Sequence, residues 1–168
     1  SGGKKNTVNF EFIKGRLKTR YFSSSPQAAS RYFKNLYQEN PSNESKYAYV
    51  IALKLNNEAE LAIDFLNEML EKYPKNLILN ITKSEILFHD QRLDHALKNI
   101  NKVLNISPKN YPASIIKSKI LSAKKETIQA EEILRDLLIT KNNDPSLWLQ
   151  LSEVQRAGKN IIGYHLSR

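Results

Sequence analysis

The chain has 168 residues, and its 26 lysines and arginines exceed its 17 aspartates and glutamates, for a formal net charge of +9. With 40% hydrophobic and 26% charged residues, its composition excludes wholesale disorder and a membrane-embedded chain. There is no cysteine, which excludes disulfides, thiolate catalysis and cysteine-rich zinc modules. The 5 glycines, against roughly 12 at average usage, favour helices over a hairpin-rich β fold.

The N-terminal segment is the most basic part of the chain. Its opening Ser1-Gly2-Gly3 resembles a vector-derived remnant, and we expect residues 1–7 to be this remnant followed by a tail. No stretch is apolar and long enough for a membrane span or a signal peptide. Because the chain also ends inside a helical pattern, we expect it to be a fragment of a larger protein. From the N-terminus to Arg20, Glu11 is the only acidic residue beside the cations Lys4, Lys5, Lys14, Arg16, Lys18 and Arg20.

The same segment carries aromatic residues among its cations, a mixture compatible with nucleic-acid binding. However, its apolar residues recur at helical spacing, and a helix with this pattern buries one face. We therefore expect the apolar stripe to pack against the helix that carries Phe33, with the lysines solvated. The stripe consists of Phe10, Ile13, Leu17 and Tyr21.

An internal repeat organises the rest of the sequence. Alanines recur at Ala29, Ala62, Ala96 and Ala130, at a nearly constant interval of roughly 34 residues. Prolines recur at Pro41, Pro74, Pro108 and Pro145, and the longer last interval shows that the last unit carries an insertion. Each alanine lies in a segment with apolar residues three and four apart, which predicts an amphipathic helix. Alanine at this position lets two antiparallel helices approach closely.

Second helical segments lie between the alanine-bearing ones, at 44–55, 77–88, 112–123 and 146–157. The joints within pairs are 56–57, 90–92 and 158–159, and Ser25-Pro26 and Asp144-Pro145 read as helix starts. The sequence thus predicts an all-α solenoid of antiparallel helix hairpins over residues 8–168. Its units are expected at about 10–42, 43–75, 76–109, 110–144 and, as a partial unit, 145–168.

This pattern resembles the tetratricopeptide repeat, a helix-turn-helix unit of about 34 residues. Trp148, Leu151 and Ser152 fit the opening of its consensus, and Ser84 and Ser118 occupy its small position. Val50 occupies that position in the second unit, a departure that predicts looser packing there.

A second resemblance covers nearly the whole chain. The runs FEFIKGRL (10–17), YAYVIALKLN (47–56), WLQLSE (148–153) and GYHLSR (163–168) are similar in order and spacing to the repeat region of periplasmic zinc metalloproteases of the β-barrel assembly-enhancing type. The resemblance implies a Gram-negative periplasm, an HExxH protease domain outside this chain that holds the zinc, and a role in outer-membrane protein assembly. The implied partners are that protease domain, the assembly machinery and barrel substrates.

Catalytic motifs are missing from the sequence. Zinc proteolysis needs two histidines one helical turn apart, whereas His89, His95 and His165 do not form such a pair. Acidic pairs such as Glu131-Glu132 lie on predicted solvated faces, and there is no glycine-rich phosphate loop. We therefore expect no enzyme activity, no cofactor and no small-molecule substrate for this chain.

Stacked hairpins present a concave surface made by the first helix of each pair, and partners usually bind there. Tyr47 and Ile51 stand where chaperone-binding repeats carry a lysine and asparagine clamp, which disfavours a C-terminal carboxylate as ligand. A cytoplasmic scaffold that binds a peptide, and a basic RNA-binding solenoid using Lys14, Lys18, Lys117, Lys119 and Lys124, are the alternatives. The predicted partner-binding groove is lined by Tyr47, Ile51, Lys54, Ile81, Glu85, Phe88, Lys119, Leu149, Glu153 and Arg156.

Overall fold

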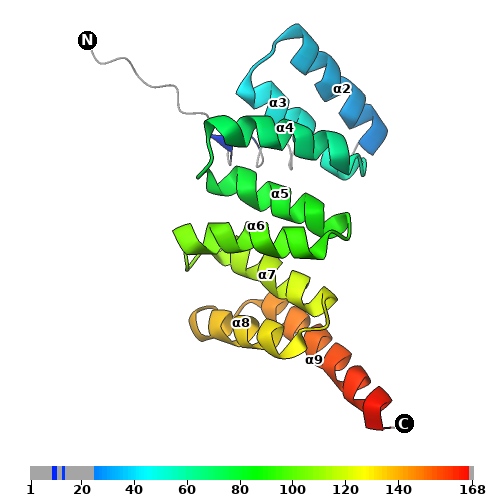
Figure 1. The fold of residues 1–168 in the computed structure, drawn as a ribbon, viewed down its shortest axis with the longest axis vertical. Helices are drawn as coiled ribbons and strands as arrows, with labels where there is room; N and C mark the ends of the chain where they lie inside the picture. Colours follow the sequence, from blue (N-terminus) through cyan, green and yellow to red (C-terminus); the bar gives the residue numbers. More distant parts are fainter. Residues whose placement is uncertain (1–8, 11–12, 14–24, 167–168) are drawn as a thin grey trace, which may run out of the picture. The chain divides into compact units, whose positions relative to one another are not determined.

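The fold is taken from a computed structural model, which describes residues 9–10, 13 and 25–166, with side chains up to residue 159. Within this part every regular element is a helix (Figure 1). The chain divides into two compact units, unit 1 up to Ile86 and unit 2 from Leu87 onward. No described helix combines the length and apolarity that crossing a bilayer requires. The all-α class and the consecutive hairpins predicted from the repeat are confirmed.

Among the residues that the structure describes, unit 1 holds three complete helices and most of a fourth. α2 packs against α3 and α3 against α4, each pair joined by a short turn. The side chain of Ser25 caps α2 by accepting a hydrogen bond from the Ala28 N–H at 3.2 Å, and Ser42 and Ser45 form a capping box at the start of α3. The elements are α2 (Pro26–Glu39), α3 (Asn43–Leu55), α4 (Ala59–Lys72) and α5 (Leu77–His89), whose last three residues belong to unit 2.

Unit 2 repeats this arrangement. α6 packs against α7, α7 against α8 and α8 against α9. Its core joins the last three helices through Leu121, Leu134, Leu147, Leu151 and Val154, all buried. The elements are α6 (Leu93–Ile106), α7 (Tyr111–Ala123), α8 (Thr127–Thr140) and α9 (Pro145–Leu166).

The periodic small residues lie where the helices approach one another. Ala62, Ala96 and Ala130 have no exposed surface, and Ala29 is 6% exposed, as the close-packing argument predicts. The Ser84 and Ser118 hydroxyls are buried too and donate to carbonyls of their own helices, Asn80 at 3.0 Å and Ile115 at 2.8 Å. A buried serine is tolerated here because its hydroxyl is satisfied.

Three turns within hairpins share one backbone conformation. Asn57, Gln91 and Lys125, which occupy the same position of successive repeats, have positive φ angles of 59°, 60° and 66°. The residue after each donates its N–H to a carbonyl of the preceding helix, as Glu126 does to Leu121 at 2.9 Å. This left-handed cap satisfies carbonyls that the helix end leaves unpaired.

The third predicted joint, at Gly158-Lys159, is wrong. α9 runs without interruption from Pro145 to Leu166. Gly158 is needed for close approach instead: a Cβ added there would lie 3.3 Å from Thr127 Oγ1, so α8 and α9 pack together at this point. A glycine in a helical pattern can indicate a turn, but here it provides space for the neighbouring helix.

Candidate partner-binding groove

A groove of about 340 Å³ lies on the first-helix face of unit 2. The end of α5, the C-terminal half of α7 and the middle of α9 form its walls. Three predicted site residues line it, Phe88, Lys119 and Glu153, so these are brought together by the fold. We call this surface the first-helix groove; it is lined by Phe88, Ser118, Lys119, Ser122, Ala123, Gln150, Glu153 and Val154.

The first-helix groove combines an apolar wall with two opposite charges. Phe88 is half-buried, while Lys119 and Glu153 are exposed. No ion pair joins either charge to another residue in the described part of the chain. Both are therefore available to groups of opposite charge on a ligand, while Phe88 offers apolar area to a side chain.

Gln150 adds a hydrogen-bonding group to this groove. Its Oε1 atom is buried and has no hydrogen-bond donor among the described residues. An unsatisfied buried acceptor costs about 1–3 kcal/mol. An N–H donated by a bound peptide would remove that cost, so this oxygen favours a ligand with main-chain amides.

The remaining predicted residues on α9 are exposed but do not line the groove. Leu149 is 61% exposed and Arg156 is exposed as well. Trp148, 53% exposed beside Leu149, donates its indole N–H to the Asn142 carbonyl at 2.8 Å. The indole is thereby held against the connection between α8 and α9.

The equivalent positions in unit 1 are buried, so their predicted role as groove lining is corrected. Tyr47, Ile51 and Ile81 are at most 5% exposed. The Tyr47 ring packs edge-on against Phe10, with centroids 5.1 Å apart, and its hydroxyl is hydrogen-bonded to Thr82 Oγ1 at 2.9 Å. These side chains are core residues because their apolar area and polar atoms are already satisfied within the unit.

Lys54 and Glu85 were predicted in the same groove. Both are half-buried and form an ion pair with each other between α3 and α5. Each charge is therefore compensated inside unit 1. The pair links two first helices rather than offering a charge to a ligand.

The carboxylate of Asp144 accepts several hydrogen bonds at the start of α9. Asp144 accepts hydrogen bonds from the Ser146 N–H at 2.9 Å, the Ser146 hydroxyl at 2.6 Å and the Tyr111 hydroxyl at 2.6 Å. The Ser146 hydroxyl, then Tyr111, lower the pKa of Asp144 to about 2, because these bonds favour the charged form. The predicted helix start at Asp144-Pro145 is confirmed.

The lysines proposed for RNA binding do not share one surface in the described structure. Lys117 lines a different groove from Lys119, and Lys124 forms an ion pair with Asp94. Lys14 and Lys18 lie outside what the structure describes, as do residues 1–7, expected to be a remnant and a tail, and the side chain of His165. Phe10, from the predicted N-terminal stripe, is buried against Tyr47 and Tyr73.

Metal ligands are not grouped within the described part of the chain, where no cluster of three or more His, Asp or Glu side chains is found. Sequence reasoning missed five residues of the first-helix groove, among them Ser122 and Gln150. Ser122 lies one repeat interval after Phe88, so the repeat itself was a signal for it. Gln150 is a polar residue one repeat interval after Ile116, a core residue, and a polar side chain at a core register was the available signal.

Comparison with known proteins identifies the fold. The chain is similar to a tetratricopeptide repeat protein of Parabacteroides merdae ATCC 43184, with a TM-score of 0.73 and 15% identity over 96% of this chain and 64% of the other. It thus spans less than two thirds of that protein's length. A thermophilic TPR protein of Thermus thermophilus gives a TM-score of 0.68 and 18% identity, over 87% of this chain and 81% of the other.

MamA of Desulfovibrio magneticus RS-1, from residue 41 to its end, gives a TM-score of 0.67 and 17% identity, over 94% of this chain and 89% of the other. No protein-family model matches the chain, and no curated protein matches it. At these identities the likeness concerns the fold alone. The chain has the fold of tetratricopeptide repeat proteins.

Proposed function

We propose that this chain is a non-catalytic module that binds a segment of another protein in the first-helix groove of unit 2. The observation that carries the proposal is the groove itself, in which Phe88, Lys119, Glu153 and the unsatisfied Gln150 oxygen converge. An apolar wall, a charge of each sign and an acceptor for main-chain amides are the groups that recognise a peptide.

The ligand that fits best is an extended peptide with one apolar anchor. The anchor would cover the half-buried Phe88 ring, and a main-chain N–H would pair with Gln150. Charges on the peptide would set orientation and association rate more than affinity, because Lys119 and Glu153 are exposed. Binding should accordingly depend only weakly on salt.

Peptides selected from a display library against the wild-type protein test this function. Phe88→Ala should weaken their binding about tenfold or more, because anchor contacts carry most of the binding free energy. Glu153→Lys should weaken it by about threefold to fivefold, mainly through slower association. Glu132→Lys, an exposed charge on α8 outside the groove, is the matched control and should leave binding within about twofold. Selected peptides that bind the groove variants as well as wild type would contradict the proposal.

We further propose that the module belongs to a periplasmic zinc metalloprotease with a chaperone role in outer-membrane protein quality control. The support is the similarity of the runs at 10–17, 47–56, 148–153 and 163–168 to that family's repeat region. The solenoid would position the protease domain beside the outer-membrane assembly machinery and its barrel substrates, with zinc bound only in the protease domain.

The parent gene tests this context. A secretion signal followed by an HExxH domain upstream of the repeats is the expected result. A gene that encodes neither would remove the periplasmic proposal and leave a cytoplasmic scaffold that binds a peptide through the same groove.

A further inference from the structure

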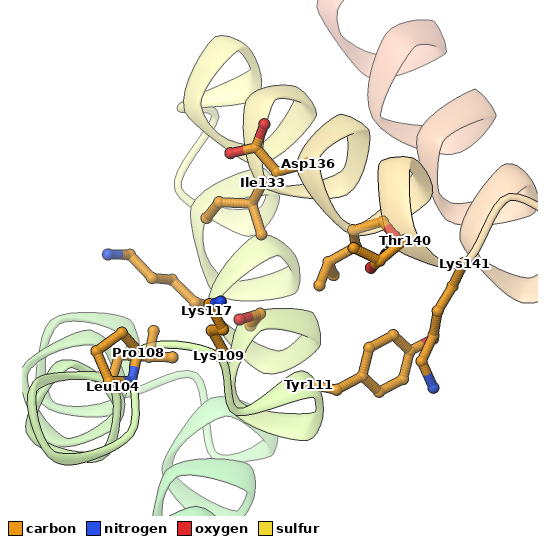
Figure 2. A pocket seen from close by; sticks show the side chains of 11 residues that line it. Leu104, Pro108, Lys109, Tyr111, Lys117, Ile133, Asp136, Thr140 and Lys141 are labelled. Carbon is orange, nitrogen blue, oxygen red and sulfur yellow. Dashed lines mark hydrogen bonds between the residues drawn. The ribbon is translucent and has the colours of Figure 1, made fainter.

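A second, larger groove of about 660 Å³ lies on the other side of α7 in unit 2. Figure 2 shows its walls: the end of α6 with Leu104, the α6–α7 connection with Pro108, the start of α7 with Tyr111, and α8 with Ile133 and Thr140. We call it the lysine groove. It shares no lining residue with the first-helix groove.

The floor of the lysine groove is apolar. Leu104, Ile133 and Leu137 are each only partly buried, and the last two also pack against the core of unit 2. Their remaining exposed area is hydrophobic surface that water covers at a cost of about 25 cal/mol per Å². An apolar side chain of a ligand would find a complementary surface here.

The rim of the groove is positively charged. Lys109, Lys117 and Lys141 line it, against the single carboxylate of Asp136. None of the three lysines forms an ion pair with the part of the chain that the structure describes. The three come from different elements: the α6–α7 connection, the middle of α7 and the residue after α8.

One end of the rim is held rigid. The Lys141 ammonium lies 4.2 Å from the centre of the Tyr111 ring, and the Tyr111 hydroxyl donates to Asp144 at 2.6 Å. This chain of contacts ties the cation to the N-cap of α9. A charge fixed before binding loses less conformational freedom when a ligand arrives.

We propose that the lysine groove binds an acidic segment of a partner protein that carries an apolar anchor. Charge complementarity decides the occupant, because three uncompensated lysines surround an apolar floor. The chain's own N-terminal segment does not fit, since Glu11 is its only acidic residue up to Arg20. Nucleic acid fits less well, because phosphates gain nothing from the apolar floor and are repelled by Asp136. The proposal goes beyond the first-helix groove and does not depend on it.

Fluorescence anisotropy with defined probes tests this inference. The probes are a synthetic amphipathic peptide of glutamates and leucines at helical spacing, the same peptide with glutamine for glutamate, and polyuridine RNA. The acidic peptide should bind the wild-type protein. The double variant Lys109→Glu with Lys117→Glu should lower the affinity for this peptide about tenfold or more at low salt. The glutamine peptide should bind correspondingly more weakly.

Two controls separate this site from general charge and from the other groove. Lys125→Glu makes the same charge change as either of these two substitutions alone, in the same unit but in the turn beyond the opposite end of α7, and should change binding by less than about twofold. Glu153→Lys, which alters only the first-helix groove, should not weaken binding of the acidic peptide. Ile133→Ala, with its unfolding midpoint measured in parallel, should weaken binding while the protein stays folded.

Four outcomes would overturn the proposal. Two concern the acidic peptide: failure to bind the wild-type protein at all, or equally tight binding to the lysine variants. Polyuridine that binds more tightly than the peptide, with a steep salt dependence that the lysine variants remove, would assign the groove to nucleic acid. Sedimentation that shows a dimer dissolved by Lys117→Glu would assign it to a second copy of the chain.

Discussion

One register of the first helices is buried in unit 1, partly buried at Ile115 on α7 and largely exposed on α9 of unit 2. Tyr47 and Ile81 in unit 1 are 0% and 2% exposed, whereas Leu149 in unit 2, at the same register of the repeat, is 61% exposed. The contrast teaches that the repeat fixes which way a side chain points but not what covers it. In unit 1, Phe10 and Thr82 cover Tyr47.

The largest expected effect is a difference in the free energy of unfolding between alanine variants at the buried and the exposed position. Tyr47→Ala should lower the free energy of unfolding by about 3–5 kcal/mol, because it leaves a cavity and removes the partner of the buried Thr82 hydroxyl. Leu149→Ala should change it by less than about 0.5 kcal/mol. Urea unfolding followed by circular dichroism measures both. Equal losses at the two positions would contradict the contrast.

Interior positions, unlike those on the first-helix face, should behave alike in both units. Ala62 and Ala130 are fully buried, so Ala62→Leu and Ala130→Leu should each destabilise the protein by about 1–3 kcal/mol through overpacking. The unfolding midpoints of the two variants provide the measurement. If one variant were as stable as wild type, helices at that alanine would not be in close contact.

Substitution by glycine at the turn position should change stability in opposite directions in two successive repeats. Lys125 has a φ of 66°, so Lys125→Gly should stabilise the protein by about 0.5–1 kcal/mol. Lys159, the equivalent residue of the next repeat, lies inside α9, so Lys159→Gly should destabilise by about 0.5–1 kcal/mol. Thermal melts of the two variants should shift in opposite directions, and a shift in the same direction would contradict the continuous helix.

The last prediction concerns the dependence of stability on acid pH. The pKa of Asp144 is lowered to about 2 in the folded protein, below about 3.9 for an unfolded aspartate. Its hydrogen bonds therefore stabilise the protein at any pH above the unfolded pKa. This contribution is lost as the pH falls through about 4 toward 2. Asp144→Asn should therefore lower the urea midpoint near neutral pH, and its difference from wild type should shrink in acid. A difference that stays constant with pH would show that the charge of Asp144 is not responsible.

Much of the fold was predictable because it follows from one interval. The buried alanines, the helix segments between 44 and 123 and the capped starts at Ser25 and Asp144 all follow from spacing and local chemistry. The continuation of α9 through Gly158 was not predictable, because a close contact with Thr127 and a turn use the same residue type. Local sequence cannot distinguish these two uses.

The two grooves were harder to predict than the helices. Phe88, Lys119 and Glu153 were found because they occupy related registers on three first helices. The sequence did not predict the lysine groove, because its three lysines come from a connection, a first helix and a helix end with no common interval. They are Lys109, Lys117 and Lys141. Charges gathered from different elements become visible only when the helices are packed.

The contrast between the units can be measured directly, because the chain has no cysteine. Single substitutions Ile81→Cys, Lys119→Cys and Leu149→Cys give one thiol each, and their rates of reaction with a maleimide report accessibility in the folded protein. The account predicts fast labelling at Lys119→Cys and Leu149→Cys, and labelling at Ile81→Cys that is slower by roughly a hundredfold or more, limited by local opening. Equal rates at Ile81→Cys and Leu149→Cys would show that the first-helix face is open in both units and would contradict the account.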